Sequence, residues 1–473
     1  MKKQLFGILI LTLSMSICAC NKSKPSSESS DSGSSSETTE ESSGPQFEPF
    51  KTKTTVEMNA SLSESKMKYD LEFNYSDEYF LRDATTYDKE LSELSFGAAY
   101  ASTYARNGSI FFNATKFHNI TAVSYDTEPT DESIAYFIAH KTIDDSELFA
   151  ISIRGFEYQL EWADNFRIGK TGDHNGFGAR ANEIYERLQE YIDEHLDGKT
   201  LKLWIAGYSR AGAIANVLSN LILKGEEIVI EQKDMYVYTF EAPNCIDSTD
   251  IVAYQNVHNI LNQNDIITSI PPTSYNLGRC GVTYEIYDEN VRDIVRSFDE
   301  SIPFPEFVTI DIDEPITKDS ELVSYVLGYI FNNQSESEDV KANTANTREE
   351  YADRYQEGLS YMIGLAFSLP SSTLNSIVND ISGRGMGAIS LLGDETGEEL
   401  ANVFKQYLDR DNISYDNEKL VSSCAVLRNG IMYLFLPLIL IYMNTDYRQS
   451  LTRLIYMHYP ESTYALLLNA HKK

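Results

Sequence analysis

Lysine and arginine are scarce in this sequence: its 473 residues include 39 of them against 71 aspartates and glutamates, a net charge of −32 at pH 7. Nucleic acid and anionic lipid are bound through clustered cations, so the charge balance argues against a nucleic-acid partner and against docking through a basic patch. Thirteen prolines and 25 glycines are too few for a collagen-like or wholly disordered chain. What remains is an acidic globular protein with a sizeable core.

Cysteine is also rare, with five in the whole chain. Cys245, Cys280 and Cys424 are widely scattered, and their spacing matches neither a disulfide scaffold nor a zinc site. The sequence leaves open whether one bridge forms among them. No two histidines share metal-ligand spacing, so we expect no metal and no cofactor.

The amino-terminal residues are typical of an export signal. Lys2 and Lys3 precede an apolar stretch, 5–17, that is too short to span a bilayer comfortably. It ends in Ile17-Cys18-Ala19-Cys20, which resembles the lipobox of bacterial lipoproteins and implies cleavage before Cys20 and lipid attachment to its sulfur. The alternative is an ordinary secretory signal that happens to contain cysteines.

A serine-rich segment follows, with 11 serines in residues 23–43. Such a composition cannot bury enough apolar surface to fold. We therefore predict a signal peptide at 1–19, an acidic tether at 20–49 and a folded part at 50–473. The protein is expected outside the cytoplasm, anchored to the cell membrane through the lipid on Cys20.

Strands and helices alternate at short intervals in the middle of the chain. Residues 133–143 and 147–153 form two β-rich runs around a turn, and 179–196 has the apolar spacing of an amphipathic helix. Further strands are expected at 201–206, 235–240 and 257–261, with a helix at 213–223. This alternation predicts an α/β fold with a mostly parallel sheet covered on both faces.

The pattern differs on either side of this region. Residues 50–119 are mixed, with one clear helix at 87–104. After Cys280 we find helical patterns and few convincing strands, and we predict a large helical insertion at about 275–450. Its apolar run 431–443 suggests a buried helix broken by Pro437, with a lipid-facing lid as the alternative. The helical patterns are at 322–331, 351–367, 398–408 and 420–443.

The most informative residues are Gly207-Tyr208-Ser209-Arg210-Ala211, which stand between a predicted strand and a predicted helix. In a nucleophile elbow the serine occupies a strained strand-to-helix turn, and its neighbours at two positions on either side must be small. Gly207 and Ala211 meet this requirement, and Gly212 lets the helix approach the sheet closely. Ser209 is therefore a candidate nucleophile.

With this elbow, the chain resembles the class 3 lipase family of α/β-hydrolases over about 130–275 and a short piece near the carboxyl end. The resemblance implies a Ser-His-Asp triad with Ser209 as nucleophile and Asp265 as its acid. It also implies an oxyanion hole from the backbone N–H groups of Phe156 and Arg210. The motifs that carry it, besides the elbow, are Ile153-Arg154-Gly155, Trp162-Ala163-Asp164-Asn165, His174-Asn175-Gly176-Phe177, Tyr238-Thr239-Phe240-Glu241-Ala242-Pro243 (family pattern Thr-Phe-Gly-x-Pro) and Asn264-Asp265-Ile266-Ile267 with Pro271-Pro272.

The base must be a histidine beyond Asp265 in this chain order, and only His458 and His471 qualify. His458 stands directly before a helix that begins with Pro460, where a catalytic loop residue is expected. His471 is three residues from the end and should be frayed. His174 is expected to be a structural hydrogen-bonding residue.

Three residues depart from the family pattern. Phe156 stands where a hydroxyl residue is usual, Tyr208 replaces histidine, and Arg210 replaces an apolar residue; the last two do not touch the chemistry directly. The leading hypothesis is a surface-anchored serine ester hydrolase acting on acylglycerols or related lipids. The alternatives are a non-catalytic lipoprotein that uses a degenerate hydrolase fold for binding, and a hydrolase of phospholipid, polysaccharide acetyl ester or thioester.

Overall fold

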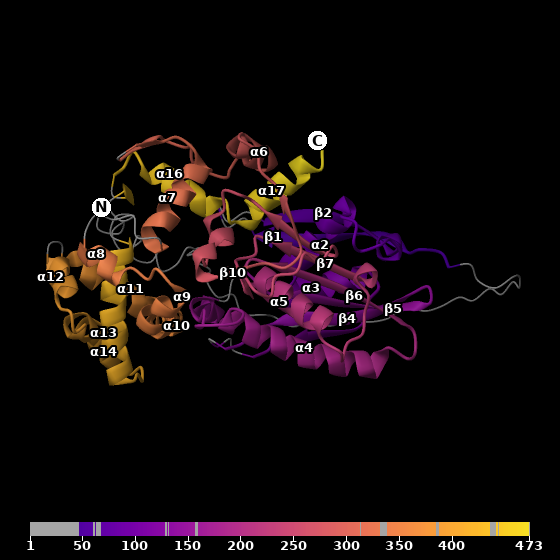
Figure 1. Ribbon diagram of the computed structural model, residues 1–473, viewed down its shortest axis with the longest axis horizontal. Coiled ribbons are helices and arrows are strands. Elements are labelled where there is room, and N and C mark those ends of the chain that lie inside the picture. The colour runs from indigo at the N-terminus through magenta and orange to yellow at the C-terminus, as the bar shows by residue number, and fades with distance from the viewer. Residues whose placement is uncertain are drawn as a thin grey trace, which may run out of the picture.

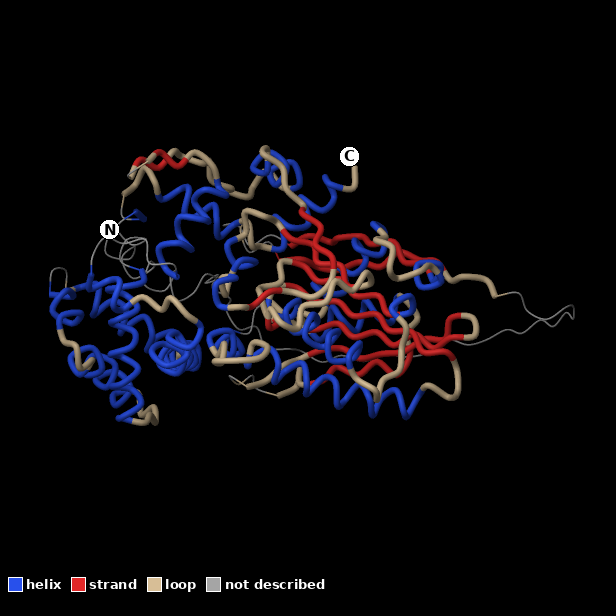
Figure 2. The backbone as a smooth tube through the Cα atoms, in the orientation of Figure 1, coloured by secondary structure: helices blue, strands red, loops and turns tan. Residues whose placement is uncertain are grey.

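The computed structural model describes residues 47–59, 62, 68–127, 130, 132–156, 159–312, 314–331, 338–384, 387–435, 441–442 and 444–472. The predicted signal peptide, the lipidation site Cys20 and nearly all of the tether lie outside them. The molecule has two parts, one built on a sheet and one almost wholly helical (Figure 1). Figure 2 shows most of the strands gathered in the first part.

A seven-stranded sheet forms the centre of the sheet part, in the order β11-β9-β7-β6-β5-β4-β3. Neighbours from β11 to β5 pair in parallel, and β5-β4-β3 are antiparallel, so the predicted α/β fold with a mostly parallel sheet is confirmed. The strands are β3 (His118–Val123), β4 (Tyr136–Ile143), β5 (Ser146–Ile153), β6 (Thr200–Tyr208), β7 (Met235–Phe240), β9 (Val257–Leu261) and β11 (Val282–Glu285).

Both faces of this sheet are covered by helices, which is why β5, β7 and β9 are buried at every position. Strand β6 sends Trp204 and Tyr208 to the face that packs on α2 (Lys89–Ala101), α3 (Ala105–Ala114) and α17 (Pro460–Ala470). Its Leu203 and Ile205 point to the face covered by α4 (Asn175–His195) and α5 (Arg210–Lys224). The carboxyl ends of β6 and β9 thus lie between two helical layers.

Two strand predictions were incomplete. The amino-terminal region, predicted only as mixed, forms the antiparallel pair β1 (Lys51–Asn59) and β2 (Lys68–Ser76), which packs against α2 and α3. After Cys280, β11 joins the main sheet as its edge strand. Shorter strands pair as β8 (Ile246–Asp247) with β10 (Leu277–Gly278) and β12 (Ile310–Asp311) with β13 (Pro315–Ile316).

The helical part lies at one end of the sheet part and has a hydrophobic cluster of its own, centred on residues such as Ile377 and Leu408. Its predicted apolar run 431–443 falls partly outside the described residues. Within those residues, we find no helix long and apolar enough for a membrane span. The helices after the sheet are α6 (Val291–Phe298), α7 (Asp319–Phe331), α8 (Glu338–Asn343), α9 (Arg348–Tyr351), α10 (Glu357–Ser368), α11 (Ser371–Gly383), α12 (Ala388–Gly393), α13 (Glu398–Arg410), α14 (Asn417–Asn429) and α16 (Arg448–Tyr456), with π-helical turns at Ala352–Gln356 and Gly430–Phe435.

Arg348 joins the two parts. Its guanidinium is buried and donates hydrogen bonds to five backbone carbonyls of the loop before α4, those of Ile168, Gly169, Thr171, Gly172 and Asp173. Helix α10 also packs along the 3-10 helix η2 (Gln159–Phe166) of the sheet part. The start of the helical part is therefore fixed to the sheet part by charge-assisted hydrogen bonds as well as apolar contact.

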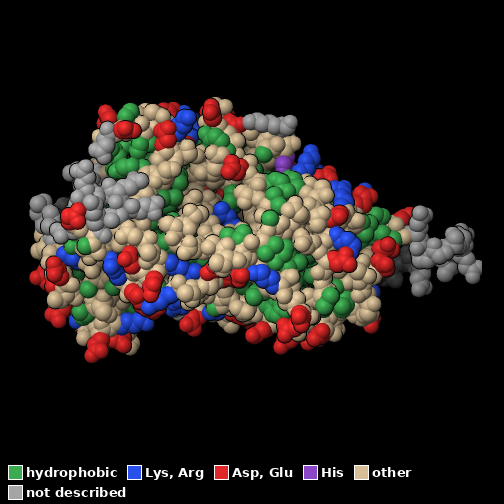
Figure 3. Space-filling view, viewed as in Figure 1, with side chains coloured by type: hydrophobic (Ala, Val, Ile, Leu, Met, Phe, Trp, Pro, Cys, Tyr) green, Lys and Arg blue, Asp and Glu red, His purple; other side chains and the backbone are tan. Residues whose placement is uncertain are grey.

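Acidic side chains are spread over the visible face of the molecule, with basic ones among them (Figure 3). On this face the acidic side chains are not gathered into one concentrated patch.

Candidate active site

Ser209 occupies a sharp turn between β6 and α5. Its φ is +56° and its ψ is −125°, a strained conformation for a residue with a side chain, and its N–H donates to the carbonyl of Phe240 at 2.8 Å. The next residue, Arg210, already begins α5. The hydroxyl is thus held at the carboxyl end of a central strand and at the amino end of a helix, as a nucleophile elbow requires.

The small residues around Ser209 are needed for this turn to close. A Cβ atom at Gly207 would lie 2.3 Å from the carbonyl oxygen of Ala211, and one at Gly155 would lie 1.9 Å from the carbonyl oxygen of Tyr208. At Gly212 it would lie 3.0 Å from the Cβ of Ala242. Gly207 and Gly155 therefore stand where a side chain does not fit, and at Gly212 a side chain would be tightly packed.

The structure brings Ser209, His458 and Asp265 together, although His458 follows Asp265 by 193 positions. The Oγ of Ser209 lies 2.8 Å from Nε2 of His458, and Nδ1 of His458 lies 2.5 Å from Oδ2 of Asp265. Asp265 is wholly buried, and its other oxygen accepts from the N–H of Ile267 at 2.8 Å. Both carboxylate oxygens are occupied, so the carboxylate is fixed behind the imidazole.

Tyr208 holds the loop that carries His458. Its hydroxyl donates to the backbone carbonyl of His458 at 2.6 Å and lies 3.0 Å from Oγ1 of Thr463 on α17. Tyr208 therefore helps to position His458, although its place in the sequence indicates no such role. The contact joins residues 250 positions apart, and no local pattern signals it.

The other two histidines considered above have different surroundings. The prediction that His471 is frayed was wrong. Its ring lies 2.8 Å from both the Tyr87 hydroxyl and a Glu93 carboxylate oxygen, so the last turn of α17 is fixed by side chains. His174 caps α4, accepting from the N–H of Phe177 at 3.4 Å. Complete burial lowers the pKa of His174 from 6.5 to about 3, which suits a structural role and not that of a base.

A buried ionic network surrounds the side chain of Arg210. Its Nη1 lies 3.1 Å from Oε2 of Glu161, its Nε donates to Oδ1 of Asn165 at 3.3 Å, and Arg154 pairs with the same Glu161. Burial lowers the pKa of Arg210, and the neighbouring carboxylates oppose this effect. Glu161 thus ties the Arg-Gly turn, through Arg154, to the residue after the nucleophile.

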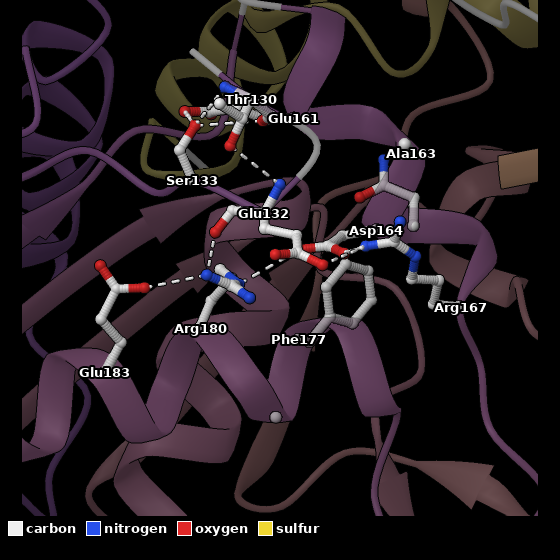
Figure 4. A network of polar contacts seen from close by, with 12 residues as sticks. Thr130, Glu132, Ser133, Glu161, Ala163, Asp164, Arg167, Phe177, Arg180 and Glu183 are labelled. Atoms are coloured by element: carbon white, nitrogen blue, oxygen red, sulfur yellow. Dashed lines mark hydrogen bonds and ion pairs between the residues drawn. The ribbon is translucent and has the colours of Figure 1, made fainter. Parts of the chain in front are cut away.

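The network continues through Asp164, which lies between two further arginines (Figure 4). Arg167 contacts it at 2.8 Å and Arg180 at 3.2 Å, and Arg180 also pairs with Glu183 at 2.9 Å. Removing one partner of such a buried set would leave an uncompensated charge. The segment that follows the Arg-Gly turn is therefore held in one conformation.

An apolar cavity of about 200 Å³ opens beside Ser209 and His458. The two predicted oxyanion-hole residues, Phe156 and Arg210, both line it. Phe156 is half-buried and contacts the rings of Tyr100 and Tyr459. The sheet part contributes Pro243, Ile267 and Ile270 to the wall, and the helical part contributes Ile330, Phe331, Tyr351 and Leu359.

Cys245, Cys280 and Cys424 are buried free thiols. Among the residues that the structure describes, no three histidine, cysteine, aspartate or glutamate side chains are grouped as a metal site would require.

One family model matches part of the chain, and several solved structures are similar to it. Three fungal lipase structures are similar to the chain: a lipase–inhibitor complex (18% identity, TM-score 0.34, covering 43% of this chain and 81% of that one), the Rhizomucor miehei lipase propeptide complex (19%, 0.33, 43% and 71%) and the lipase of Rhizopus microsporus var. chinensis (17%, 0.32, 42% and 75%). A search among curated proteins finds no match. Residues 150–275 match the family model of class 3 lipases, and this matched segment contains both Ser209 and Asp265.

Proposed function

We propose that the protein is a serine ester hydrolase in which Ser209 is the nucleophile, His458 the general base and Asp265 the acid that orients His458. The observation that carries this proposal is the continuous hydrogen-bonded chain of the three side chains, with Ser209 Oγ 2.8 Å from His458 Nε2 at the edge of an apolar cavity. A hydroxyl in that contact can lose its proton to the imidazole as it attacks a carbonyl.

The geometry supports an acyl-enzyme mechanism. As Ser209 attacks the ester carbonyl, its proton moves to Nε2 of His458, and Asp265 stabilises the imidazolium through Nδ1. The backbone N–H groups of Phe156 and Arg210, with the positive end of α5, are the proposed donors to the oxyanion. When the tetrahedral intermediate collapses, His458 gives its proton to the leaving alcohol, and water then hydrolyses the acyl-serine by the same steps.

The cavity walls favour an acyl chain as the group bound beside Ser209. They are mainly Ile, Leu, Phe and Pro side chains, and burying each methylene of a substrate there contributes about 0.8 kcal/mol. Acylglycerols and related carboxylic esters are thus the proposed substrates. Phe156 has no hydroxyl to offer the oxyanion as a further donor, and the loss of one such donor costs roughly 10² in rate, so slow turnover is expected.

We further propose that the hydrolase is held at the cell membrane through a lipid on Cys20. The sequence supports this through the lipobox-like Ile17-Cys18-Ala19-Cys20 and the serine-rich tether after it. Mass spectrometry of the processed amino terminus tests the proposal: the lipid should appear on Cys20 and should be lost in Cys20→Ser. An unmodified mature terminus would instead indicate an ordinary secretory signal.

A panel of chromogenic esters with short to long acyl chains tests the catalytic proposal. The wild-type protein should hydrolyse at least one chain length, and Ser209→Ala should not. A fluorophosphonate probe should label the wild type at Ser209 and leave the variant unlabelled. Equal background rates for both proteins, without labelling, would favour a binding protein built on a hydrolase fold.

A further inference from the structure

Glu241 is an acidic residue at an unusual place, directly after β7, where the class 3 motif Thr-Phe-Gly-x-Pro has its glycine. Its φ is +47°, in the left-handed region that favours glycine, and its side chain is wholly buried. Both the backbone and the surroundings are unfavourable for a carboxylic acid. Residues that break local rules in this way are found mostly at functional sites.

The carboxyl group of Glu241 lies against the acid of the proposed triad. One oxygen accepts from the N–H of Asn262 at 2.9 Å, and the other accepts from Oγ1 of Thr463 at 2.9 Å. The negative charge of Asp265 acts on the same group. Ionisation of a second buried carboxyl so near to a carboxylate is unfavourable.

Glu241 is the one of the two carboxyls whose environment favours the protonated form. Burial and the negative charge of Asp265 raise the pKa of Glu241 well above its usual value. Asp265 in turn accepts from Nδ1 of His458, so a negative charge on Asp265 is the one that stabilises the imidazolium. The O–H of Glu241 is then available as a donor to Asp265.

The contacts of Glu241 also close a ring behind the triad. Thr463, which donates to Glu241, lies 3.0 Å from the hydroxyl of Tyr208, and that hydroxyl donates to the carbonyl of His458. His458 in turn contacts Asp265, whose charge acts on Glu241. One buried carboxyl group thus connects the acid turn, the histidine loop and the residue before the nucleophile.

We propose that Glu241 is a positioning residue of the triad, which donates a hydrogen bond to Asp265 and, through Thr463 and Tyr208, fixes the loop of His458. This inference rests on the proposed function, since it assigns Glu241 to the same site. Glu241 acts through Asp265 and does not contact substrate. Glycine, the residue of the family motif, could supply neither hydrogen bond.

Two substitutions in the full chain test the proposal. Glu241→Gln keeps a donor towards Asp265 and an acceptor for Thr463, whereas Glu241→Gly removes both and relieves the backbone conformation. We expect Gln to retain kcat within about threefold and Gly to lose roughly tenfold or more in kcat with little change in KM. Thermal unfolding of both variants checks that they fold. Equal kcat for the wild type and Glu241→Gly would overturn the proposal.

The pH profile separates positioning from a general structural effect. The charged and titratable groups around Glu241 are Asp265, His458 and the buried Arg279, with Tyr208 and Glu461 close behind. If Glu241 is neutral, Gln leaves the acid limb of the kcat/KM profile in place. In Glu241→Gly the hydrogen bond to Asp265 is lost, so the negative charge of Asp265 acts more strongly on His458. His458 is then protonated more readily, and the acid limb of the kcat/KM profile moves to higher pH.

An ionised Glu241 predicts the opposite sign. Either substitution would then remove a negative charge near His458, the imidazolium would be less stable, and the acid limb would move to lower pH. That result for Glu241→Gln would overturn the proposal even if kcat fell as expected.

A spectroscopic readout keeps this test separate from the proposed function. If wild type and Ser209→Ala hydrolyse esters equally, the proposed function fails, and the Nδ1 proton of His458 in its 2.5 Å contact with Asp265 still reports the pairing by NMR. We expect a far-downfield resonance that is retained in Glu241→Gln and shifted in Glu241→Gly. An identical resonance in Glu241→Gly would refute the hydrogen bond from Glu241 to Asp265.

Discussion

The sheet part and the helical part contribute different things to one cavity. From the sheet part come every side chain proposed to react and the buried polar groups that hold them, on the ends of β6 and β9 and before α17. The helical part supplies apolar wall residues, including Ile330 and Leu359, and is fastened through Arg348. The difference indicates that the sheet part determines the chemistry and the helical part the substrate selectivity. Substitutions in one part should therefore change one of these properties without the other.

The largest effect is expected on the sheet side. Ser209→Ala and His458→Ala should each lower kcat by about 10⁴–10⁶, because either change removes the proton transfer on which the whole unit depends. Neither should lower the melting temperature by more than a few degrees, since no large apolar group is removed. Ester hydrolysis and thermal unfolding measure the two quantities.

His471→Ala is the matched control, since its imidazole lies between Tyr87 and Glu93 and has no contact with Ser209. It should keep its activity and lose a little stability. Wild-type turnover in His458→Ala would contradict the assignment of the base.

The same contrast explains what the sequence could predict. The elbow around Ser209 and the strand–helix alternation from β4 to β9 depend on local rules: small residues flanking a turn, and periodicities of 2 and 3.6. The acid turn at Asp265 followed from the resemblance to class 3 lipases, and the choice of His458 followed from its place after Asp265 in the chain. The strands and helices lie at or close to the predicted positions, and His458 lies next to Asp265.

Contacts between distant segments could not be predicted in this way. Tyr208 looked like a neutral replacement, yet its hydroxyl bonds to a carbonyl 250 positions later. The role of Arg348 could not be predicted from helical periodicity, because its partners are backbone carbonyls of a loop distant in the sequence. The β1–β2 pair was missed although β2 alternates clearly, with Tyr69, Leu71 and Phe73 at every second position. The helices that cover the pair follow it in the chain.

The second prediction tests the fastening of the helical part. Arg348→Met keeps the aliphatic stem and removes donors to five carbonyls, which should lower the free energy of unfolding by about 3 kcal/mol. Because Tyr351 and Leu359 follow it closely and line the cavity, KM should rise more than kcat falls. Denaturant unfolding and steady-state kinetics with one ester measure both effects.

Arg354→Met provides the control from the same segment, because Arg354 is partly exposed, with 43% of its side chain accessible. If the two variants lost equal stability, the hydrogen bonds from Arg348 to the backbone carbonyls would stabilise the contact between the two parts no more than Arg354 does.

The third prediction concerns the stability of the sheet part alone. Burial lowers the pKa of His174 from 6.5 to about 3, so between these values the unfolded chain binds a proton that the folded one does not. Stability from this group is therefore complete above pH 6.5 and is lost as the pH falls, by about 1.4 kcal/mol per unit. Urea unfolding at pH 7, 6 and 5 should show this slope.

His174→Asn retains a side chain able to cap α4 and should have a slope shallower by that amount. A wild-type slope in His174→Asn would show that other groups account for the acid sensitivity of the fold.

The smallest effect should be on chain-length selectivity, and it tests the helical part as the selective wall. Ile330 is buried on α7 and lines the cavity. Ile330→Ala makes room for one or two more methylenes, each contributing about 0.8 kcal/mol, so kcat/KM for a long ester relative to a short one should rise roughly tenfold. Ile330→Phe should move that ratio in the opposite direction.

Ile377→Ala is the control, because Ile377 is equally buried in the helical part but belongs to a cluster that does not line the cavity. Loss of stability lowers the amount of folded enzyme and so reduces the rates for both esters by the same factor. The ratio of the two rates does not change with the amount of folded enzyme, so it measures only the effect of the cavity wall on chain-length selectivity. A ratio that changed equally in Ile330→Ala and Ile377→Ala would show that the helical part supports the site without selecting its substrate.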